Sequence, residues 1–407
     1  SRCCRAASLS KSTRCWRSPD GARPVKEILA RVLTAAADLP AAHWNACAGT
    51  DNPFTRHEFF ASLEASGSAG PRTGWQAAHI VVDGDDGAPV GIMPAYLKSH
   101  SQGEYVFDHG WADAFERAGG RYYPKLQCSV PFTPATGPRL LLRDPAAAPI
   151  LLAAAETLAR TNRLSSVHAT FVSPDQQPLF EAQGWLRRVG EQFHWSNDGY
   201  TGFDDFLGAL ASRKRKAIRR EREGALASGV SIEHLTGSDL TEAAWDAFWD
   251  FYQDTGARKW GRPYLTRRFF SLIGEAMPER VLLMLASRGG RPVAGALNFI
   301  GGDCLYGRYW GSIEDIPFLH FELCYYQAIE WAIAHGLARV EAGAQGQHKL
   351  ARGYRPVATV SMHYIPDRGF RAAVADFVAH EGAMIEADIE ALDMATPFRR
   401  GSGPEGA

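Results

Sequence analysis

The feature that most constrains the fold is a sequence motif that occurs once in each half of the chain. His79–Val82 and Val281–Ala286 are short apolar runs typical of buried strands. A glycine-containing turn follows each run, and then a Pro-Val segment that ends in glycine, Pro89–Gly91 in the first copy and Pro292–Gly295 in the second. Apolar runs joined by such turns indicate β-hairpins. A hairpin that recurs in this way predicts a duplicated domain.

The segments around the hairpins predict that helices and strands alternate in both halves. Residues 25–37 have the weak periodicity of a helix, and Glu322–His335 has a clear apolar stripe that ends before a glycine. Residues 105–107, 185–195 and 360–364 have the pattern of strands. Interleaved helices and strands indicate an α/β fold (α+β) with a mixed sheet.

Composition divides the chain into four expected segments. Residues 1–23 are basic, with no acid before Asp20, and we expect a disordered leader that is either transit-like or a translated upstream segment outside the fold. Residues 24–198 and 199–395 are the two expected domains, and the second is entered through a basic helix. Residues 396–407 are polar and are expected to form a disordered tail.

Overall composition excludes several classes of protein. The chain has 44 basic and 45 acidic residues, so it is not a general polyanion binder. Its seven cysteines are scattered without a Cys-x-x-Cys pair, which argues against a disulfide framework and favours the cytoplasm, or an organelle matrix if the leader is a transit peptide. No apolar run approaches the roughly 20 residues that span a bilayer. No set of residues has the spacing of a zinc site.

Positive charge is concentrated between the halves. Residues 213–223 carry seven basic and two acidic side chains, and a narrow apolar stripe of Leu207, Leu210 and Ile218 indicates a single helix over residues 204–227. Arg215 and Arg219 are its candidate phosphate contacts. The phosphates could belong to tRNA or to CoA, and a solvated helix face is the alternative.

Several longer phrases resemble the Fem-like branch of the GNAT acyltransferases. Gln177–Trp185 and the strand after it resemble the closing segment of a GNAT domain, and the basic helix followed by Gly229 resembles that of Fem-type peptidoglycan aminoacyltransferases. Four further phrases resemble the FemAB-like family of peptidoglycan biosynthesis or recognition, and they are Tyr122–Gln127, Val130–Pro134, Phe318–Glu322 and Ala342–Lys349. The resemblance covers residues 24–380.

The resemblance implies two tandem GNAT-like domains, each with a mixed, mostly antiparallel sheet flanked by helices. It implies an N-acyltransferase or aminoacyltransferase that uses acyl-CoA or aminoacyl-tRNA as co-substrate, without a tightly bound cofactor. The implied acceptor is a small-molecule or peptidoglycan-precursor amine, and tRNA is a further expected partner. A non-catalytic Fem-like recognition protein is the alternative. The glycine loop that binds CoA pyrophosphate in ordinary GNAT domains and the helical arm of many Fem enzymes are both missing, so the donor stays open.

Acyl transfer to an amine needs a proton acceptor, a stabilised oxyanion and an aligned donor and acceptor. We predict that Glu322 or His320 accepts the proton; the alternative is that Glu322 caps its helix and His320 packs. The loop 341–352 resembles the Fem segment that holds a lysine, which predicts a catalytic role for Lys349, with Arg352 as the other candidate for that position. No Ser-His-Asp or Cys-His phrase occurs, which favours direct transfer.

Donor binding is predicted from the same loop, from one strand and from the basic helix, where side chains and glycines suit a carboxylate or phosphate. These residues are Arg308, Gln345, Gly346, His348, Arg352, Arg215 and Arg219. Acceptor binding is expected in the first half, where polar residues next to aromatic ones suit a sugar or peptide. These residues are Asp108, His109, Trp111, Tyr122, Tyr123 and Lys125.

Overall fold

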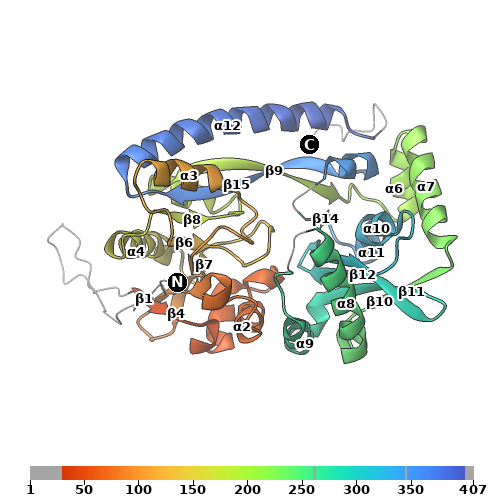
Figure 1. The fold of residues 1–407 in the computed structure, drawn as a ribbon, viewed down its shortest axis with the longest axis horizontal. Helices are drawn as coiled ribbons and strands as arrows, with labels where there is room; N and C mark the ends of the chain where they lie inside the picture. The colour runs from red at the N-terminus through yellow and green to blue at the C-terminus, as the bar shows by residue number, and fades with distance from the viewer. Residues whose placement is uncertain (1–29, 260–262, 344–345, 399–407) are drawn as a thin grey trace.

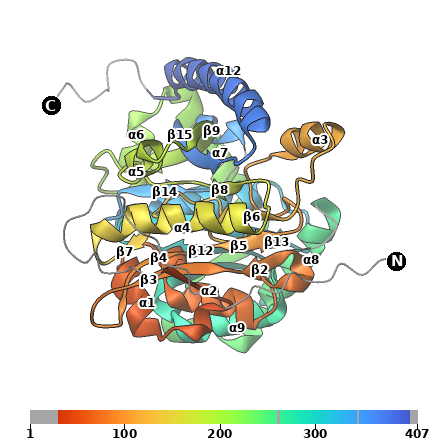
Figure 2. The same cartoon turned by 90° about the vertical axis from the view of Figure 1, so that its left-hand side faces the viewer.

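A computed structural model of the protein describes residues 30–259, 263–343 and 346–398. Helices cover the faces of mixed, mostly antiparallel sheets (Figures 1 and 2), which confirms the predicted fold class. The predicted leader, residues 1–23, lies outside the described residues. Residues 396–398, expected in the disordered tail, instead pack on the segment after Leu207, where Phe398 forms a bridge with Leu210.

The strands alternate with helices in both halves. The strands of the first half are β1 (Ala30–Leu33), β2 (Trp75–Ala77), β3 (His79–Asp83), β4 (Pro89–Met93), β5 (Tyr96–Lys98), β6 (Lys125–Cys128), β7 (Leu141–Leu142), β8 (Val167–Ala169) and β9 (Leu186–Ser196). Those of the second half are β10 (Val230–Leu235), β11 (Val281–Arg288), β12 (Arg291–Ile300), β13 (Cys304–Ser312), β14 (Arg339–Glu341) and β15 (Arg355–Tyr364).

The helices of the first half are α1 (Ala41–Ala48), α2 (His57–Ala65), α3 (His109–Arg117), α4 (Ala148–Thr161) and α5 (Gln177–Ala182). Those that follow are α6 (Phe203–Ala209), α7 (Ser212–Leu226), α8 (Glu242–Lys259), α9 (Arg267–Ala276), α10 (Leu319–Phe321), α11 (Gln327–Ala334) and α12 (Arg368–Met394). A π-helical turn, Glu322–Tyr326, joins α10 to α11.

The repeated motif forms an antiparallel hairpin in each half, β3–β4 and β11–β12. Both hairpins carry a register shift directly before the turn, at Val82/Asp83 and at Ala286/Ser287. The glycines of the motif have the same purpose, since a Cβ at Gly91 would meet Ala147, just before α4, and Leu151 of α4, and one at Gly295 would meet Phe248 of α8. A shared bulge and a shared close approach of a helix support the predicted duplication.

The two halves exchange their last strands. In the first half β6 runs parallel to β8, and in the second β13 runs parallel to β14. Strand β9 then leaves the first half and pairs with β14, while β15 leaves the second half and pairs with β8. Strands β9 and β15 pair with each other along Leu186–His194, so one sheet of order β10-β11-β12-β13-β14-β9-β15-β8-β6-β5-β2 crosses both halves. The boundary at 198/199 stays a prediction, because elements on both sides of it share this sheet.

Aromatic packing also joins the halves. Phe54 and Phe59 of the first half lie 5.2 and 5.4 Å, between ring centroids, from Phe299 of β12. Phe59 also lies 5.9 Å from Phe269 of α9 in edge-to-face geometry. These rings belong to a buried cluster drawn from both halves. Burial of so much aromatic surface stabilises the contact between the halves.

Three local predictions are wrong. The helix expected at 25–37 is replaced, in the described part of that range, by strand β1 at residues 30–33 and the start of a 3-10 turn, Ala36–Asp38, because pairing with β3 overrides weak helix propensity. Residues 105–107 form a loop in which Tyr105 has a φ of 60°. The single basic helix is divided into α6 and α7, which are separated at Leu210 and Ala211.

Replacing Gly311 in β13 by alanine should destabilise the fold by about 1–3 kcal/mol, because the added methyl would overlap the backbone of Phe251 in α8. Gly208→Ala in α6 is the matched control. A Cβ at Gly208 has open space around it, so this change should raise stability by about 0.5–1 kcal/mol. Urea unfolding measures both, and equal effects of the two substitutions would contradict the packing described for β13.

Candidate active site

The parallel strands β13 and β14 separate after a short contact. They pair only at Cys304–Tyr306 and Arg339–Glu341, and a cavity of about 130 Å³ opens beyond Gly307 and Ala342. A Cβ at Gly307 would lie 3.5 Å from the Cα of Ala342, so glycine keeps the two segments close at the start of the opening. We call this opening the split cavity. Its polar lining residues are Asn298, Arg308, Tyr309, His320, Cys324 and Tyr325.

Asn298 lies on the β12 wall of the split cavity, next to a register shift against β13. Its side chain is buried, and Nδ2 donates to the carbonyls of Leu282 and Ala296 at 3.4 and 3.2 Å. Its Oδ1 has no hydrogen-bond partner within the part of the chain that the structure describes. A buried, unpaired acceptor is costly, so this oxygen suits a ligand N–H. Sequence reasoning missed Asn298, although a lone amide in an apolar strand is a usable signal.

His320, one of the two predicted proton acceptors, lies in the wall of the split cavity. Its ring packs edge-on against Trp310 and Tyr325, at centroid distances of 5.2 and 5.5 Å. The π-helical turn that follows it places Cys324 and Tyr325 in the same wall. Single π-helical turns are frequent at functional sites because they re-aim side chains that an α-helix would turn elsewhere.

Glu322 faces away from the split cavity. Its fully buried carboxylate accepts hydrogen bonds from Arg222 Nε and Nη2 at 3.1 and 2.9 Å and from Gln327 Nε2 at 2.8 Å. Arg222 also bonds Glu330 at 2.6 Å. Glu322 therefore fastens α7 to the π-helical turn, and of the two predicted proton acceptors only His320 lines the cavity.

Lys349 lies behind the cavity wall. Its side chain is 1% exposed, and Nζ donates to the carbonyl of Gly343 at 2.7 Å, next to the lining residue Ala342. Burial lowers the pKa of Lys349 to about 8, and the nearby Cys324 opposes this shift. A buried ammonium beside a cavity can stabilise negative charge that develops there.

Arg352 is the other candidate for the lysine position, and neighbouring side chains hold its guanidinium in place. Its guanidinium donates to Glu221 at 2.9 and 3.0 Å and to Tyr326 Oη at 3.0 Å. It also lies 3.5 Å over the ring of Phe321. Glu221 and Arg222 of α7 thus bind the loop and the π-helical turn respectively, which fixes α7 against both.

The remaining predicted donor contacts are dispersed. Arg308 lines the split cavity and donates to the Phe132 carbonyl at 2.5 Å. His348 is exposed and bonds Tyr325 Oη at 2.8 Å, and Gly346, with a φ of 117°, precedes the 3-10 turn Gln347–Arg352. Gln345 lies outside the described residues. Arg215 is half-buried on α7, where exposed Arg219 bonds Asp204 at 3.0 Å.

One face of α7 carries the exposed cations. Figure 1 shows α7 at the edge of the second half, where it contacts α10 and the π-helical turn. Its inward side chains bind the neighbouring elements, whereas the outward side chains are basic and exposed. They are Arg213, Lys214, Lys216, Arg219 and Arg220.

The predicted acceptor residues of the first half mostly meet inside the protein. Lys125 Nζ donates to Ser101 Oγ at 2.8 Å, to Glu104 Oε2 at 2.7 Å and to the Asp108 carboxylate. Tyr122 Oη donates to the same Asp108 carboxylate at 2.5 Å. These side chains are buried, so they anchor the loop 101–108 and do not face a ligand directly.

The other predicted acceptor residues lie around this network. Tyr123 is half-buried and bonds Ser101 at 2.7 Å, and Trp111 packs 5.0 Å from the His363 ring. His109 is exposed and stacks on Phe107, 6.1 Å between ring centroids, outside the network.

Sequence reasoning missed a histidine pair that extends the network. His168 Nε2 lies 2.7 Å from Ser166 Oγ and 3.3 Å from Tyr122 Oη, and its Nδ1 lies 2.5 Å from Nδ1 of His363. Burial lowers the pKa of His168 to about 3 and also lowers the pKa of His363. His168 comes from β8 and His363 from β15, so the pair forms only through the strand exchange.

At the equivalent place in the first half, the strands do not separate as β13 and β14 do. Beyond β6 and β8, Gly137 and Val172 form a parallel bridge that closes the sheet again. Buried Arg139 fills the gap and donates to the carbonyls of Thr170 and Ala135 at 2.6 and 2.7 Å. The asymmetry places the accessible site in the second half.

Comparison with known proteins agrees with this architecture. The model of the FemAB-like family, described by peptidoglycan biosynthesis or recognition, matches residues 35–400. The chain belongs to this family. No curated protein sequence matches it. No helix among the described residues is long and apolar enough to cross a membrane, and no cluster of potential ligands there could hold a metal ion.

Solved structures share the fold of this FemAB-like protein. It is similar to the crystal structure of FemX, with 14% identity and a TM-score of 0.53 over 83% of this chain and 98% of FemX. It is also similar to the C-terminal domain of a putative lysylphosphatidylglycerol synthetase from Agrobacterium fabrum, with 10% identity and a TM-score of 0.51 over 85% and 97% of the two chains. These likenesses confirm the Fem-like fold.

Lys125→Met should cost about 3–5 kcal/mol of unfolding free energy, because it leaves the Glu104 and Asp108 carboxylates buried without their cation. Arg31→Met removes the more exposed pair of Arg31 with Asp83 and should cost less than about 1 kcal/mol. Urea unfolding at pH 7.5 compares them. If Lys125→Met costs no more than the control, the network does not anchor the loop.

Proposed function

We propose that this FemAB-like protein transfers an acyl or aminoacyl group to an amine in the split cavity, as part of peptidoglycan or cell-envelope metabolism. The observation that carries the proposal is the divergence of β13 and β14, which creates a lined cavity in the second half, whereas the equivalent place in the first half is closed. The family's link to peptidoglycan and the Fem-like fold support the class of reaction.

The lining residues fit the requirements of amine acylation. His320 is placed to accept the proton that the attacking amine loses. Asn298 Oδ1 can accept an N–H of the amine and orient it, since it has no other partner within the described chain. Lys349, in its charged form, stabilises the oxyanion from behind the wall. Glu322 and Arg352 act indirectly, because they hold the helix and loop that carry these groups.

The proposal gives Lys349 a distinct pH signature. The group works as an ammonium ion, and its pKa is lowered to about 8, so turnover should fall as pH rises through about 8. Lys349→Met should lower kcat by about 10²–10³-fold and remove this fall. Turnover is measured from pH 6 to 9.5 with acetyl-CoA and with charged tRNAs as donors and a peptidoglycan-precursor peptide as acceptor. A full rate in the variant would exclude Lys349 from the chemistry.

A lack of transfer from every donor, together with binding of the precursor peptide, would favour the alternative of a recognition protein. Glu330→Gln provides the control for altered packing near α7, because Glu330 pairs with Arg222 outside the split cavity. Its turnover should match that of the unaltered chain.

We further propose that α7 binds the phosphates of an aminoacyl-tRNA donor, because its outward face carries five exposed cations. Replacing Arg213, Lys216 and Arg220 by glutamine should reduce the slope of log affinity against log salt by about 2–3. The matched control replaces three exposed arginines elsewhere, Arg72, Arg117 and Arg291, and should leave the slope unchanged. Filter binding with charged tRNA measures the slopes, and a flat salt response of the unaltered chain would contradict tRNA binding.

A further inference from the structure

One wall of the split cavity carries a cysteine. Cys324 lines the cavity together with His320, which precedes it by four residues. Side chains at this spacing are neighbours on one face of a helix. The lack of a Cys-His motif in the sequence favoured direct transfer of the acyl group, whereas the fold places a thiol and an imidazole in the same wall. The wall therefore holds a nucleophile and a base together.

The π-helical turn fixes the direction in which Cys324 points. Its first and last residues are anchored on other elements, since Glu322 accepts a hydrogen bond from Arg222 at 2.9 Å and Tyr326 Oη accepts one from Arg352 at 3.0 Å. Neither Glu322 nor Tyr326 lines the split cavity. The wider turn of a π-helix changes which side chains share a face. Cys324, between the two anchors, is thus held against the cavity.

Cys324 differs from the other cysteines that the structure describes. It is partly exposed and outside any disulfide, whereas Cys47, Cys128 and Cys304 are buried. Burial raises the pKa of each of these three thiols. A buried thiol of raised pKa stays protonated and inert, while a thiol in a cavity can meet a ligand. Among the described cysteines, Cys324 is therefore the one suited to act as a nucleophile.

A buried cation lies near this thiol. Burial lowers the pKa of Lys349, and negative charge on the Cys324 sulfur opposes that shift. The attraction is mutual, so the Lys349 ammonium stabilises negative charge on the sulfur. The hydrogen bond from Lys349 Nζ to the Gly343 carbonyl, at 2.7 Å, keeps the ammonium in this place. An adjacent lysine is one of the surroundings that make cysteines nucleophilic.

The opposite wall offers an unpaired acceptor. Asn298 is 1% exposed, and its Oδ1 has no hydrogen-bond partner in the described part of the chain. This oxygen is directed at Gly307, where a Cβ would lie 3.4 Å from it, and Gly307 also lines the cavity. A buried acceptor in this position suits an N–H of an amine that enters the cavity. The thiol and the amine site therefore belong to the same cavity.

We propose that Cys324 carries the acyl group through the reaction as a thioester. In the first step His320 takes the thiol proton, and the Cys324 sulfur attacks the carbonyl carbon of the donor. A C–S bond forms at that carbon, and its bond to the leaving oxygen or sulfur of the donor breaks. The leaving group takes the proton from His320, so the step ends with a neutral imidazole.

In the second step the acceptor amine, oriented by Asn298 Oδ1, attacks the thioester. A C–N bond forms, the C–S bond breaks, and the proton that the amine loses passes through His320 to the Cys324 sulfur. Lys349 stabilises the oxyanion in both steps. The role of the thioester in transfer to an amine rests on the proposed function, whereas acylation of the thiol by a simple ester does not.

The first test uses p-nitrophenyl acetate, a small activated ester that is independent of the natural donor. At pH 7, below the pKa of about 8 of Lys349, a burst of p-nitrophenolate should accompany transfer of one acetyl group to each chain. Peptide mapping by mass spectrometry should place this group on Cys324, and neutral hydroxylamine should remove it, as it removes thioesters. His320→Asn should slow the burst by about 10²-fold or more.

Cys324→Ala should lose both the burst and the acetyl group. Cys47→Ala is the matched control, because it removes a buried thiol far along the chain from the split cavity and should retain both. Thermal unfolding of each variant shows whether it is folded before it is assayed. Acetylation of other residues with Cys324 left unmodified would overturn the proposal.

The second test is the initial rate of transfer with the donors and the peptide acceptor named above. A thioester intermediate predicts ping-pong kinetics, and Cys324→Ala should lower kcat by about 10²-fold or more. Unchanged turnover in Cys324→Ala would overturn the thioester and leave direct transfer, and with it the proposed function, intact. Acetylation of Cys324 by the ester without turnover from any donor would establish the nucleophile and reject the proposed function.

Discussion

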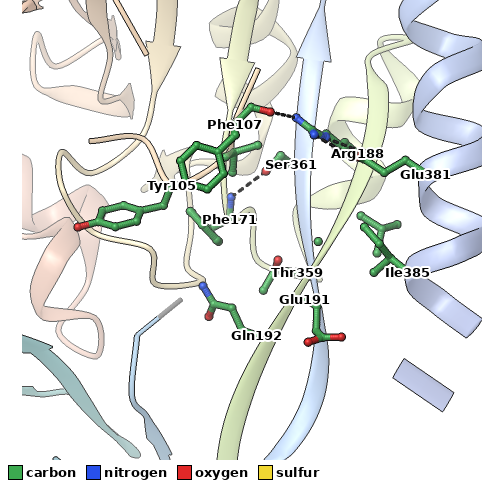
Figure 3. A pocket seen from close by; sticks show the side chains of 13 residues that line it. Tyr105, Phe107, Phe171, Arg188, Glu191, Gln192, Thr359, Ser361, Glu381 and Ile385 are labelled. Carbon is green, nitrogen blue, oxygen red and sulfur yellow. Dashed lines mark hydrogen bonds and ion pairs between the residues drawn. The ribbon is translucent and has the colours of Figure 1, made fainter. Parts of the chain in front are cut away.

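The pairing of β9 with β15 is the constraint on which the rest of the structure depends. Each strand leaves its own half and completes the sheet of the other, so neither half can satisfy its backbone hydrogen bonds alone. A two-stranded ribbon is also marginal by itself and must be covered. Helix α12 packs along both strands, and the loop 101–108 covers them from the first half (Figure 1). A cavity of about 240 Å³ is the space that these two covers leave beside the ribbon (Figure 3).

Duplication supplied two equivalent places where parallel strands can separate, and the chain uses them differently. In the first half the Gly137–Val172 bridge and the Arg139 guanidinium close the gap. In the second half Gly307 permits close pairing up to Tyr306, after which the strands diverge around a cavity. The closed copy has a structural use instead, because its Pro-rich loop offers the Phe132 carbonyl to Arg308 and Tyr309 of the open copy.

The sequence predicted features that local pattern determines and missed those that depend on distant pairing. The hairpins and strand β9 follow from turn residues and from the alternation of apolar and polar residues. The sequence pattern did not predict strand β1, because its stability comes from pairing with β3. It did not predict the His168–His363 contact either, because the strand exchange creates that contact. Residue type alone also did not indicate that Lys125 and Asp108 are buried. Charged residues next to aromatic ones are as compatible with a ligand-binding surface as with a buried network.

The buried charges of the first half show why such a costly arrangement persists. Removing Lys125, Glu104 and Asp108 from water carries a penalty that well-packed apolar residues would avoid. Apolar packing, however, is not directional, whereas one ammonium that binds three points of the loop 101–108 fixes its backbone in a single conformation. That conformation places Tyr105 near Arg308 of the split cavity, whose charge opposes the rise that burial causes in the pKa of Tyr105. The network thus lowers stability but fixes the position of the loop 101–108 beside Arg308.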